Sequence, residues 1–181
     1  SNQMESIYFP VKLQSLSAHI QFQILSEGSN IIDGLKVDTM YINHPGQAMG
    51  YVVTFGKTKI CYLTDNELIP SWATQTFRLK YKSDTREKIV KLISGADLLI
   101  HDAQYTDEEY KTKIGWGHSP LSEVLNLAKE GRVGRLALFH HDPDHFDEQI
   151  DILVANCKEN MNGAYHHMEC FSAQEGMELH F

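Results

Sequence analysis

Histidine and aspartate side chains, which can bind divalent metal ions, stand at the ends of apolar segments in this sequence. The stretch LALFHHDPDH, residues 136–145, runs from apolar residues into two histidines, an aspartate, a proline, a second aspartate and a third histidine. Similar polar groups occur earlier, and they are His44, Asp65, the pair His101 and Asp102, and His118. Imidazole and carboxylate suit zinc and similar ions, and a site usually gathers them from separate strand ends. The pattern therefore favours a metal site made of histidine and aspartate.

Each of these residues alone has a simpler interpretation. A single histidine at a strand end is more often held by a structural hydrogen bond than by a metal, and an aspartate after a strand is usually a turn or cap residue. Only the recurrence of the pattern at several strand ends favours a metal site, because a rigid scaffold meets a cleft at such positions.

The three cysteines, Cys61, Cys157 and Cys170, are odd in number and have no short paired spacing. This pattern fits a reducing compartment, and it argues against a disulfide scaffold and against a zinc site of CxxC type. Cys61 lies in the apolar run KICYL, so we expect it to be an inert thiol in the core.

Length and composition predict a single soluble domain over residues 1–181, with 42% hydrophobic and 22% charged residues. Residues 1–2 resemble the remnant of an expression tag. Neither a signal peptide nor an apolar run long enough to cross a membrane is visible, and we expect a cytoplasmic protein without a membrane partner. The net charge of −8 argues against binding nucleic acid by bulk electrostatics. Only residues 78–88 are locally basic, and they either guide an anionic substrate or form a solvated surface loop.

Periodicity predicts the elements that position these residues. Strands are expected at 19–28, 35–42, 96–103, 134–141, 165–171 and 176–181, with a hairpin over 49–65 that turns at Gly56 and Lys57. Helices are expected at 85–95, 119–131 and 146–160, the second with Ser119 as its N-cap and Pro120 at its first position. Hairpins followed by alternating strands and helices indicate an α/β (α+β) fold, in which mixed sheets carry helices on their outer faces.

Five ordered motifs resemble the metallo-β-lactamase-fold hydrolases. They are NHPGQAMGY, YLTD, ADLLIHDAQYT, GWGHS and LALFHHDPDH, with 21 residues from His44 to Asp65 and 22 from His118 to His140. The nearest branch holds transfer-RNA 3′-processing endonucleases and phosphoribosyl cyclic phosphodiesterases. The resemblance implies an αββα sandwich. The family's HxHxDH segment does not occur here, so we expect the C-terminal two-thirds of such a domain, with its N-terminal part missing.

The resemblance also implies a role for each motif residue. His44 would bind a first divalent metal ion, Asp65 would bridge two ions, and His140 would bind the second. Zinc is the first expectation for both ions, with manganese or iron as alternatives. His118 would donate a proton to the leaving group, and Asp102 would hold and charge His118; the alternative for this pair is an ordinary buried hydrogen bond. His141, Asp142 and His145 are not expected to be ligands.

The implied activity is that of a metal-dependent hydrolase, with a small anionic substrate such as a nucleotide-like or cyclic phosphodiester, cleaved by a metal-bound hydroxide. The acidic charge makes nucleic acid a less favoured substrate. Two alternatives stay open: a non-catalytic sensor or interaction module, and a hydrolase of lactones, thioesters or β-lactams. Without the HxHxDH segment we expect this chain alone to be inactive, and we expect an exposed sheet face to favour a homodimer or a swapped assembly.

Overall fold

The computed structural model describes residue 15 and residues 17–74, 84–160 and 168–181. Residues 1–2 and most of the basic stretch 78–88 therefore lie outside the described residues. The strands are β1 (Gly28–Ile32), β2 (Leu35–Ile42), β3 (Ala48–Phe55), β4 (Thr58–Leu63), β5 (Leu98–Asp102), β6 (Arg135–Phe139) and β7 (Glu169–Ser172). The helices are α2 (Asp84–Ile93), α3 (Asp107–Lys113), α4 (Leu121–Gly131) and α5 (Asp147–Asn160).

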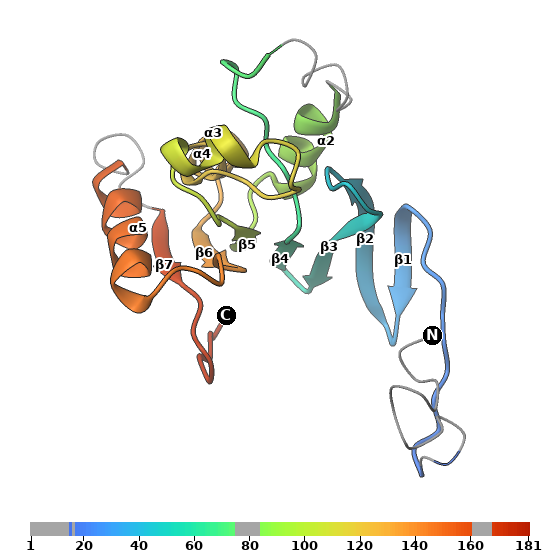
Figure 1. The fold of residues 1–181 in the computed structure, drawn as a ribbon. Coiled ribbons are helices and arrows are strands. Elements are labelled where there is room, and N and C mark those ends of the chain that lie inside the picture. Colours follow the sequence, from blue (N-terminus) through green and yellow to red (C-terminus); the bar gives the residue numbers. More distant parts are fainter. Residues whose placement is uncertain (1–14, 16, 75–83, 161–167) are drawn as a thin grey trace.

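One mixed seven-stranded sheet contains all the strands, in the order β1 to β7 (Figure 1). Strands β1 to β4 pair antiparallel. Two-residue turns join β1 to β2 and β3 to β4, the latter with Gly56 at a φ of 59°, and the longer loop 43–47 joins β2 to β3. Strands β4 to β7 pair parallel. Parallel strands need long crossover connections, and the helices occupy those connections. The predicted mixed sheet with outer helices is confirmed.

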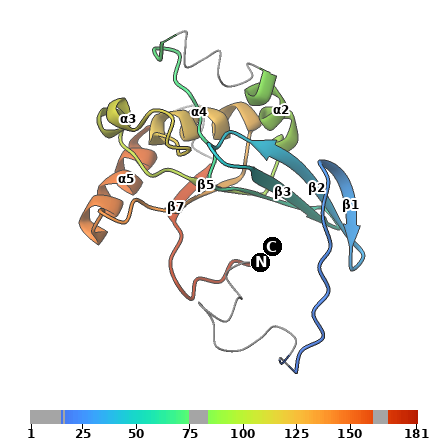
Figure 2. The ribbon, with the colours of Figure 1, turned by 45° about the vertical axis from the view of Figure 1, so that its right-hand side comes forward.

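The core lies between the sheet and a layer of helices that Figures 1 and 2 show on one side of it. One row of fully buried side chains crosses four neighbouring strands in register, namely Cys61, Leu99, Leu136 and Cys170. Helix α4 faces this core with apolar residues at helical spacing, among them Val124 and Ala128. Burial of these apolar surfaces is the main force that fixes the helices on the sheet.

The opposite face of the sheet carries larger and more exposed side chains. The next row in register runs through Tyr62, Ile100, Ala137 and Phe171, and 38% of Tyr62 is exposed. No helix among the described residues covers this face (Figure 2). The described residues therefore form one sheet of the predicted αββα sandwich, together with its helical layer.

Two predicted strands are wrong. Residues 19–27 form no ladder, and Ile20, Phe22 and Ile24 are exposed instead; the sheet begins at Gly28. Residues 176–181 likewise form no strand. Both segments alternate apolar and polar residues, but alternation yields a strand only where a neighbouring strand accepts the backbone hydrogen bonds. The described part of the strand predicted at 165–171 is confirmed as β7, whereas its first residues lie outside the described ranges.

The prediction that Ser119 caps helix α4 is also wrong. Pro120 occupies the N-cap position, and no side chain bonds to the first helical amides. Ser119 is fully buried, and its hydroxyl donates to the carbonyl of Asn66 and accepts from the amide of Leu68. The serine therefore joins two loops at the edge of the sheet rather than starting the helix.

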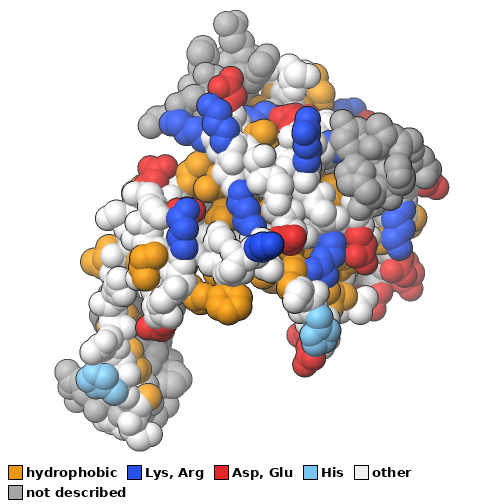
Figure 3. Space-filling view, turned by 180° about the vertical axis from the view of Figure 1, so that it is seen from behind, with side chains coloured by type: hydrophobic (Ala, Val, Ile, Leu, Met, Phe, Trp, Pro, Cys, Tyr) orange, Lys and Arg blue, Asp and Glu red, His pale blue; other side chains and the backbone are white. Residues whose placement is uncertain are grey.

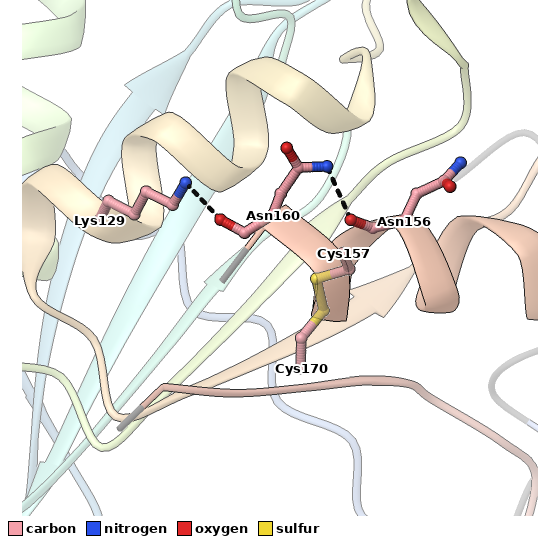
Figure 4. The surroundings of a disulfide bond; sticks show 5 residues. All are labelled: Lys129, Asn156, Cys157, Asn160 and Cys170. Carbon is pink, nitrogen blue, oxygen red and sulfur yellow. Dashed lines mark hydrogen bonds between the residues drawn. A yellow bond between two sulfur atoms is a disulfide. The ribbon is translucent and has the colours of Figure 1, made fainter. Parts of the chain in front are cut away.

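The argument against disulfides is wrong for two of the three cysteines. Cys157 of α5 and Cys170 of β7 form a disulfide (Figure 4). They are 13 residues apart in the sequence, a spacing without a recognisable motif, but the end of α5 packs beside β7. Nearby, the Lys129 ammonium group of α4 donates to the carbonyl of Asn160 at 3.0 Å. Cys61 is a free and buried thiol, as expected.

The surface seen from behind the view of Figure 1 carries scattered lysine and arginine side chains, with acidic side chains among them (Figure 3). Among the described residues, no helix combines the length and the apolar character needed to span a bilayer.

Candidate metal centre

The predicted metal-binding and catalytic residues gather at one edge of the sheet because of the strand order. Strands β4, β5 and β6 are parallel neighbours, so their carboxyl ends meet at the same edge. Asp65 follows β4, Asp102 ends β5 and His140 follows β6. His44 arrives from the antiparallel strand β2, and His118 arrives on the loop before α4. All five predicted residues therefore come from different elements, as expected for a site at strand ends.

Asp65 lies at the centre of this cluster. One of its carboxylate oxygens is 3.1 Å from Nε2 of His140 and 3.8 Å from Nδ1 of His118. Ligand atoms of His44, Asp65 and His118 all lie within 4.8 Å of one another. The rings of His118 and His140 have centroids 5.0 Å apart. These distances let a cation contact several of the side chains at once.

The backbone at two of these positions adopts a conformation that non-glycine residues rarely use. Asp65 has a φ of 59° and His140 a φ of 52°. Such left-handed residues carry strain, and they cluster at functional sites, where the surrounding fold enforces them. Here the reversal turns each side chain away from its strand direction directly after the strand has ended.

Asp102 is fully buried behind His118. Its two carboxylate oxygens accept hydrogen bonds from the backbone amides of Asn66 and Ser119, at 3.1 and 3.0 Å. The second oxygen is 3.4 Å from Nδ1 of His118. Burial alone would lower the pKa of His118, but the carboxylates of Asp102 and Asp65 outweigh it, and the pKa lies above its ordinary value. This arrangement therefore stabilises the protonated form of His118 relative to a free imidazole.

Glu67 is a site residue that sequence reasoning missed. Its buried carboxylate accepts hydrogen bonds from the amides of Gly115 and Gly117, at 2.6 and 3.1 Å, and from the hydroxyl of Tyr110 at 2.7 Å. The only signal in the sequence is that Glu67 follows Asp65 by two residues. The carboxylate fixes the loop that leads into His118.

The other histidines of the 136–145 stretch bond to protein groups. Nε2 of His141 lies 2.9 Å from the hydroxyl of Ser172, and Nε2 of His145 lies 2.9 Å from the carboxylate of Glu109. Burial, together with His145 and His140, lowers the pKa of His141. These contacts agree with the expectation that neither histidine is a ligand, which stays a prediction.

The donor set fits a divalent transition metal. Three imidazoles and one carboxylate converge from four loops, and this mixture suits zinc, manganese or iron. The geometry is compatible with two roles for His118. It lies close enough to His44 and Asp65 to be a metal ligand with them, and its contact with Asp102 is the one that a proton donor would have. The sequence analysis expected the second role.

A mixed sheet with one helical layer, carrying histidine and aspartate at the carboxyl ends of its parallel strands, defines an α/β domain with a candidate metal centre. Residues 9–141 match the model of the beta-lactamase superfamily domain, and the chain belongs to this family. A Ribonuclease Z from Thermoplasma acidophilum is 34% identical over 91 residues, which cover 49% of this chain and 29% of that protein. The Ribonuclease Z of Sulfurisphaera tokodaii is 37% identical over 79 residues, or 42% of this chain and 26% of that protein.

Solved structures show the same fold. The metallo-beta-lactamase fold protein YhfI from Bacillus subtilis superposes with a TM-score of 0.59 at 22% identity, over 87% of this chain and 54% of that one. The chain thus spans about half the length of this structure. It spans less than a third of the length of the curated relatives that it matches.

Proposed function

We propose that the protein containing this chain is a metal-dependent phosphodiesterase. The observation that carries the proposal is the cluster of His44, Asp65, His118 and His140 at one sheet edge, with the buried carboxylate of Asp102 behind His118. Relatives named Ribonuclease Z support a phosphodiester of ribonucleotides as the substrate. They oppose the sequence-based preference for small cyclic esters over nucleic acid, so an RNA end belongs among the substrates.

His44, Asp65 and His140 are the residues that would hold the metal ions, with His118 as the alternative ligand. Divalent ions bound there would supply Lewis acidity toward a phosphoryl oxygen and would lower the pKa of bound water. The HxHxDH segment, which the family resemblance implies as a source of further ligands, does not occur in this sequence.

His118 would supply the proton that the departing oxygen needs. Its Nδ1 faces Asp102 at 3.4 Å, so Nε2 is the nitrogen that remains to face the substrate. In the hydrolysis a water oxygen bonds to phosphorus and gives up a proton to the solvent, the P–O bond to the leaving alcohol breaks, and the proton on Nε2 of His118 moves to the departing oxygen. Such general acid catalysis contributes about 10²–10⁴-fold to the rate. Because Asp102 is held by two backbone amides, it can fix the ring of His118 in one orientation.

The test uses the full-length protein, reconstituted separately with zinc, manganese and iron. The substrate is a dinucleotide of uridine, whose departing alkoxide needs a proton, and bis-p-nitrophenyl phosphate, whose phenolate leaves without one, serves as the comparison. The variants are His118→Ala and, as an exposed control, His180→Ala. We expect His118→Ala to lower kcat on the dinucleotide by about 10²–10⁴-fold at unchanged metal content and to affect the nitrophenyl ester far less, and we expect His180→Ala to change neither kcat nor metal content.

Three outcomes would contradict parts of the proposal. An unchanged kcat on the dinucleotide in His118→Ala would exclude the proton-donor role. A loss of metal together with activity would make His118 a ligand. Hydrolysis of p-nitrophenyl acetate without any cleavage of phosphodiesters would favour the carboxylic-ester alternative.

A further inference from the structure

We propose that Trp116, supported by Lys113, forms a stacking site for an aromatic base of the substrate, directly beside the metal centre. The inference rests on the proposed phosphodiesterase function and deepens it. It names a nucleoside-bearing phosphodiester, rather than a simple phosphate ester, as the class of substrate.

Trp116 is an exposed aromatic residue in an unusual place. More than half of its surface, 57%, is accessible, although the residues on both sides of it belong to a well-packed loop. The ammonium group of Lys113 lies 4.2 Å from the centre of the indole ring. The lysine lies over one face of the ring, and the proposal requires the base to stack on the other. Bases stack on exposed aromatic faces in single-stranded nucleic-acid sites, and a nearby cation attracts the phosphate.

The loop holds Trp116 in place before any substrate arrives. Glu67 accepts hydrogen bonds from the amides of both neighbours, Gly115 and Gly117. Both glycines have positive φ angles, 88° and 98°, which a larger residue would rarely adopt. Because the backbone on each side of Trp116 is fixed, stacking on it costs little ordering entropy.

The same loop also contacts the metal centre. A methyl group added to Gly117 would lie 2.3 Å from Cδ2 of His44, so the loop backbone rests against the ring of His44. His118 follows Trp116 by two residues, so at most about 7 Å of extended backbone separates them. A nucleotide whose base stacks on Trp116 would therefore bring its phosphate to the cluster of His44 and His118.

Trp72 provides a matched control. It is the second tryptophan of the chain and is 52% exposed, but its ring packs edge-on against Tyr110. We expect a substitution at Trp72 to leave base recognition unchanged.

The first experiment measures hydrolysis by the full-length protein of two esters with the same leaving group, thymidine 5′-p-nitrophenyl phosphate and methyl p-nitrophenyl phosphate. We expect Trp116→Ala to lower kcat/KM for the nucleoside ester on the order of 5- to 150-fold. The methyl ester should change less than about twofold, because it has no base to stack. Trp116→Phe should retain most of the activity, and Trp72→Phe should retain all of it. An equal loss on both esters in Trp116→Ala would overturn the inference.

The second experiment needs no activity, so it separates the two proposals. Tryptophan fluorescence is titrated with uridine 5′-monophosphate and with ribose 5-phosphate, in the unaltered protein and in Trp116→Phe. We expect quenching by the nucleotide that disappears in Trp116→Phe, and no quenching by the sugar phosphate. If neither ester is hydrolysed but this quenching occurs, the proposed function fails and the stacking site stands. Identical titrations with both ligands, or quenching that survives in Trp116→Phe, would refute the stacking site.

Discussion

Gly117→Ala is expected to damage the metal centre through a single added methyl group. The methyl carbon would lie 2.3 Å from Cδ2 of His44 and 2.7 Å from Cδ of Pro45, both far inside van der Waals contact. The backbone cannot yield easily, because Glu67 holds the amide of Gly117 at 3.1 Å. The ring of His44 must therefore move, and with it a predicted metal ligand.

Two costs add up in this variant. A residue with a side chain at a φ of 98° carries strain of about 1–3 kcal/mol. Forcing a methyl group into a filled space costs a further ~1–3 kcal/mol. The displaced ring of His44 would also lose its position as a metal ligand. Losing a contact that supports a ligand lowers metal affinity by about 10–100-fold, and we expect an effect of this size here.

Gly34→Ala separates strain from contact. Gly34 has a φ of 81°, and an added methyl group there would meet nothing within 4 Å. Urea unfolding of the metal-free full-length protein measures the free energy of unfolding, and competition with a chromophoric chelator measures zinc affinity. We expect Gly34→Ala to lose only the strain energy and to bind zinc normally, whereas Gly117→Ala loses more stability and binds zinc weakly. Equal stability losses with unchanged zinc affinity in both variants would refute the packing of this loop on a metal-binding His44.

Three other predictions concern the buried carboxylate, the capping box of α3 and the disulfide. Asp102→Asn turns an amide NH₂ group toward one of two backbone N–H donors, so we expect a loss of about 1–3 kcal/mol in the free energy of unfolding. We also expect a lower pKa of His118 in an NMR titration, because the carboxylate charge is lost. An unchanged pKa of His118 would contradict its contact with Asp102. Burial would raise the pKa of Glu109, but hydrogen bonds from Thr106 and His145 outweigh it and hold the pKa below the unfolded value of 4.5. The stability that Glu109 adds is thus present above pH 4.5 and is lost as the pH falls through its lower folded-state pKa. Urea midpoints of Glu109→Gln should therefore lie below those of the unaltered protein at neutral pH, and the two should converge as the pH falls through that pKa. Reduction of the Cys157–Cys170 bond, or Cys170→Ala, should cost about 2–4 kcal/mol, read as a lower Tm that dithiothreitol does not lower further in the variant.

Local periodicity predicted most of the framework. The strand predicted at 35–42 matches β2 in both bounds, and the hairpin at Gly56 and the strands over 96–103 and 134–141 are confirmed as β3 to β6. These segments are buried, so the apolar pattern reports their environment directly. The gathering of the five candidate residues followed from the same information, because parallel neighbours present their carboxyl ends at one edge.

Features that depend on distant parts of the chain were not predictable in this way. Helix α3 is short and polar, and its N-terminus is set by a capping box between Thr106 and Glu109 that the apolar pattern does not reveal. The disulfide depends on the packing of α5 against β7. The segments around Phe22 and Leu179 have the alternation of strands but no strand beside them among the described residues. The homodimer or swapped assembly expected from an exposed sheet face stays a prediction.

Two acidic residues, Glu67 and Asp102, hold the backbone on the two sides of His118. The backbone amides on the two sides of His118 each bond to a buried carboxylate: Gly117 to Glu67, and Ser119 to Asp102. Both carboxylates are fully buried. The hydrogen bonds from the backbone amides fix each carboxylate and the backbone relative to each other. Hydrogen bonds within the protein therefore fix the backbone on both sides of His118. The loop that carries Trp116 and His118 is thus preorganised, as the proposed roles of both residues require.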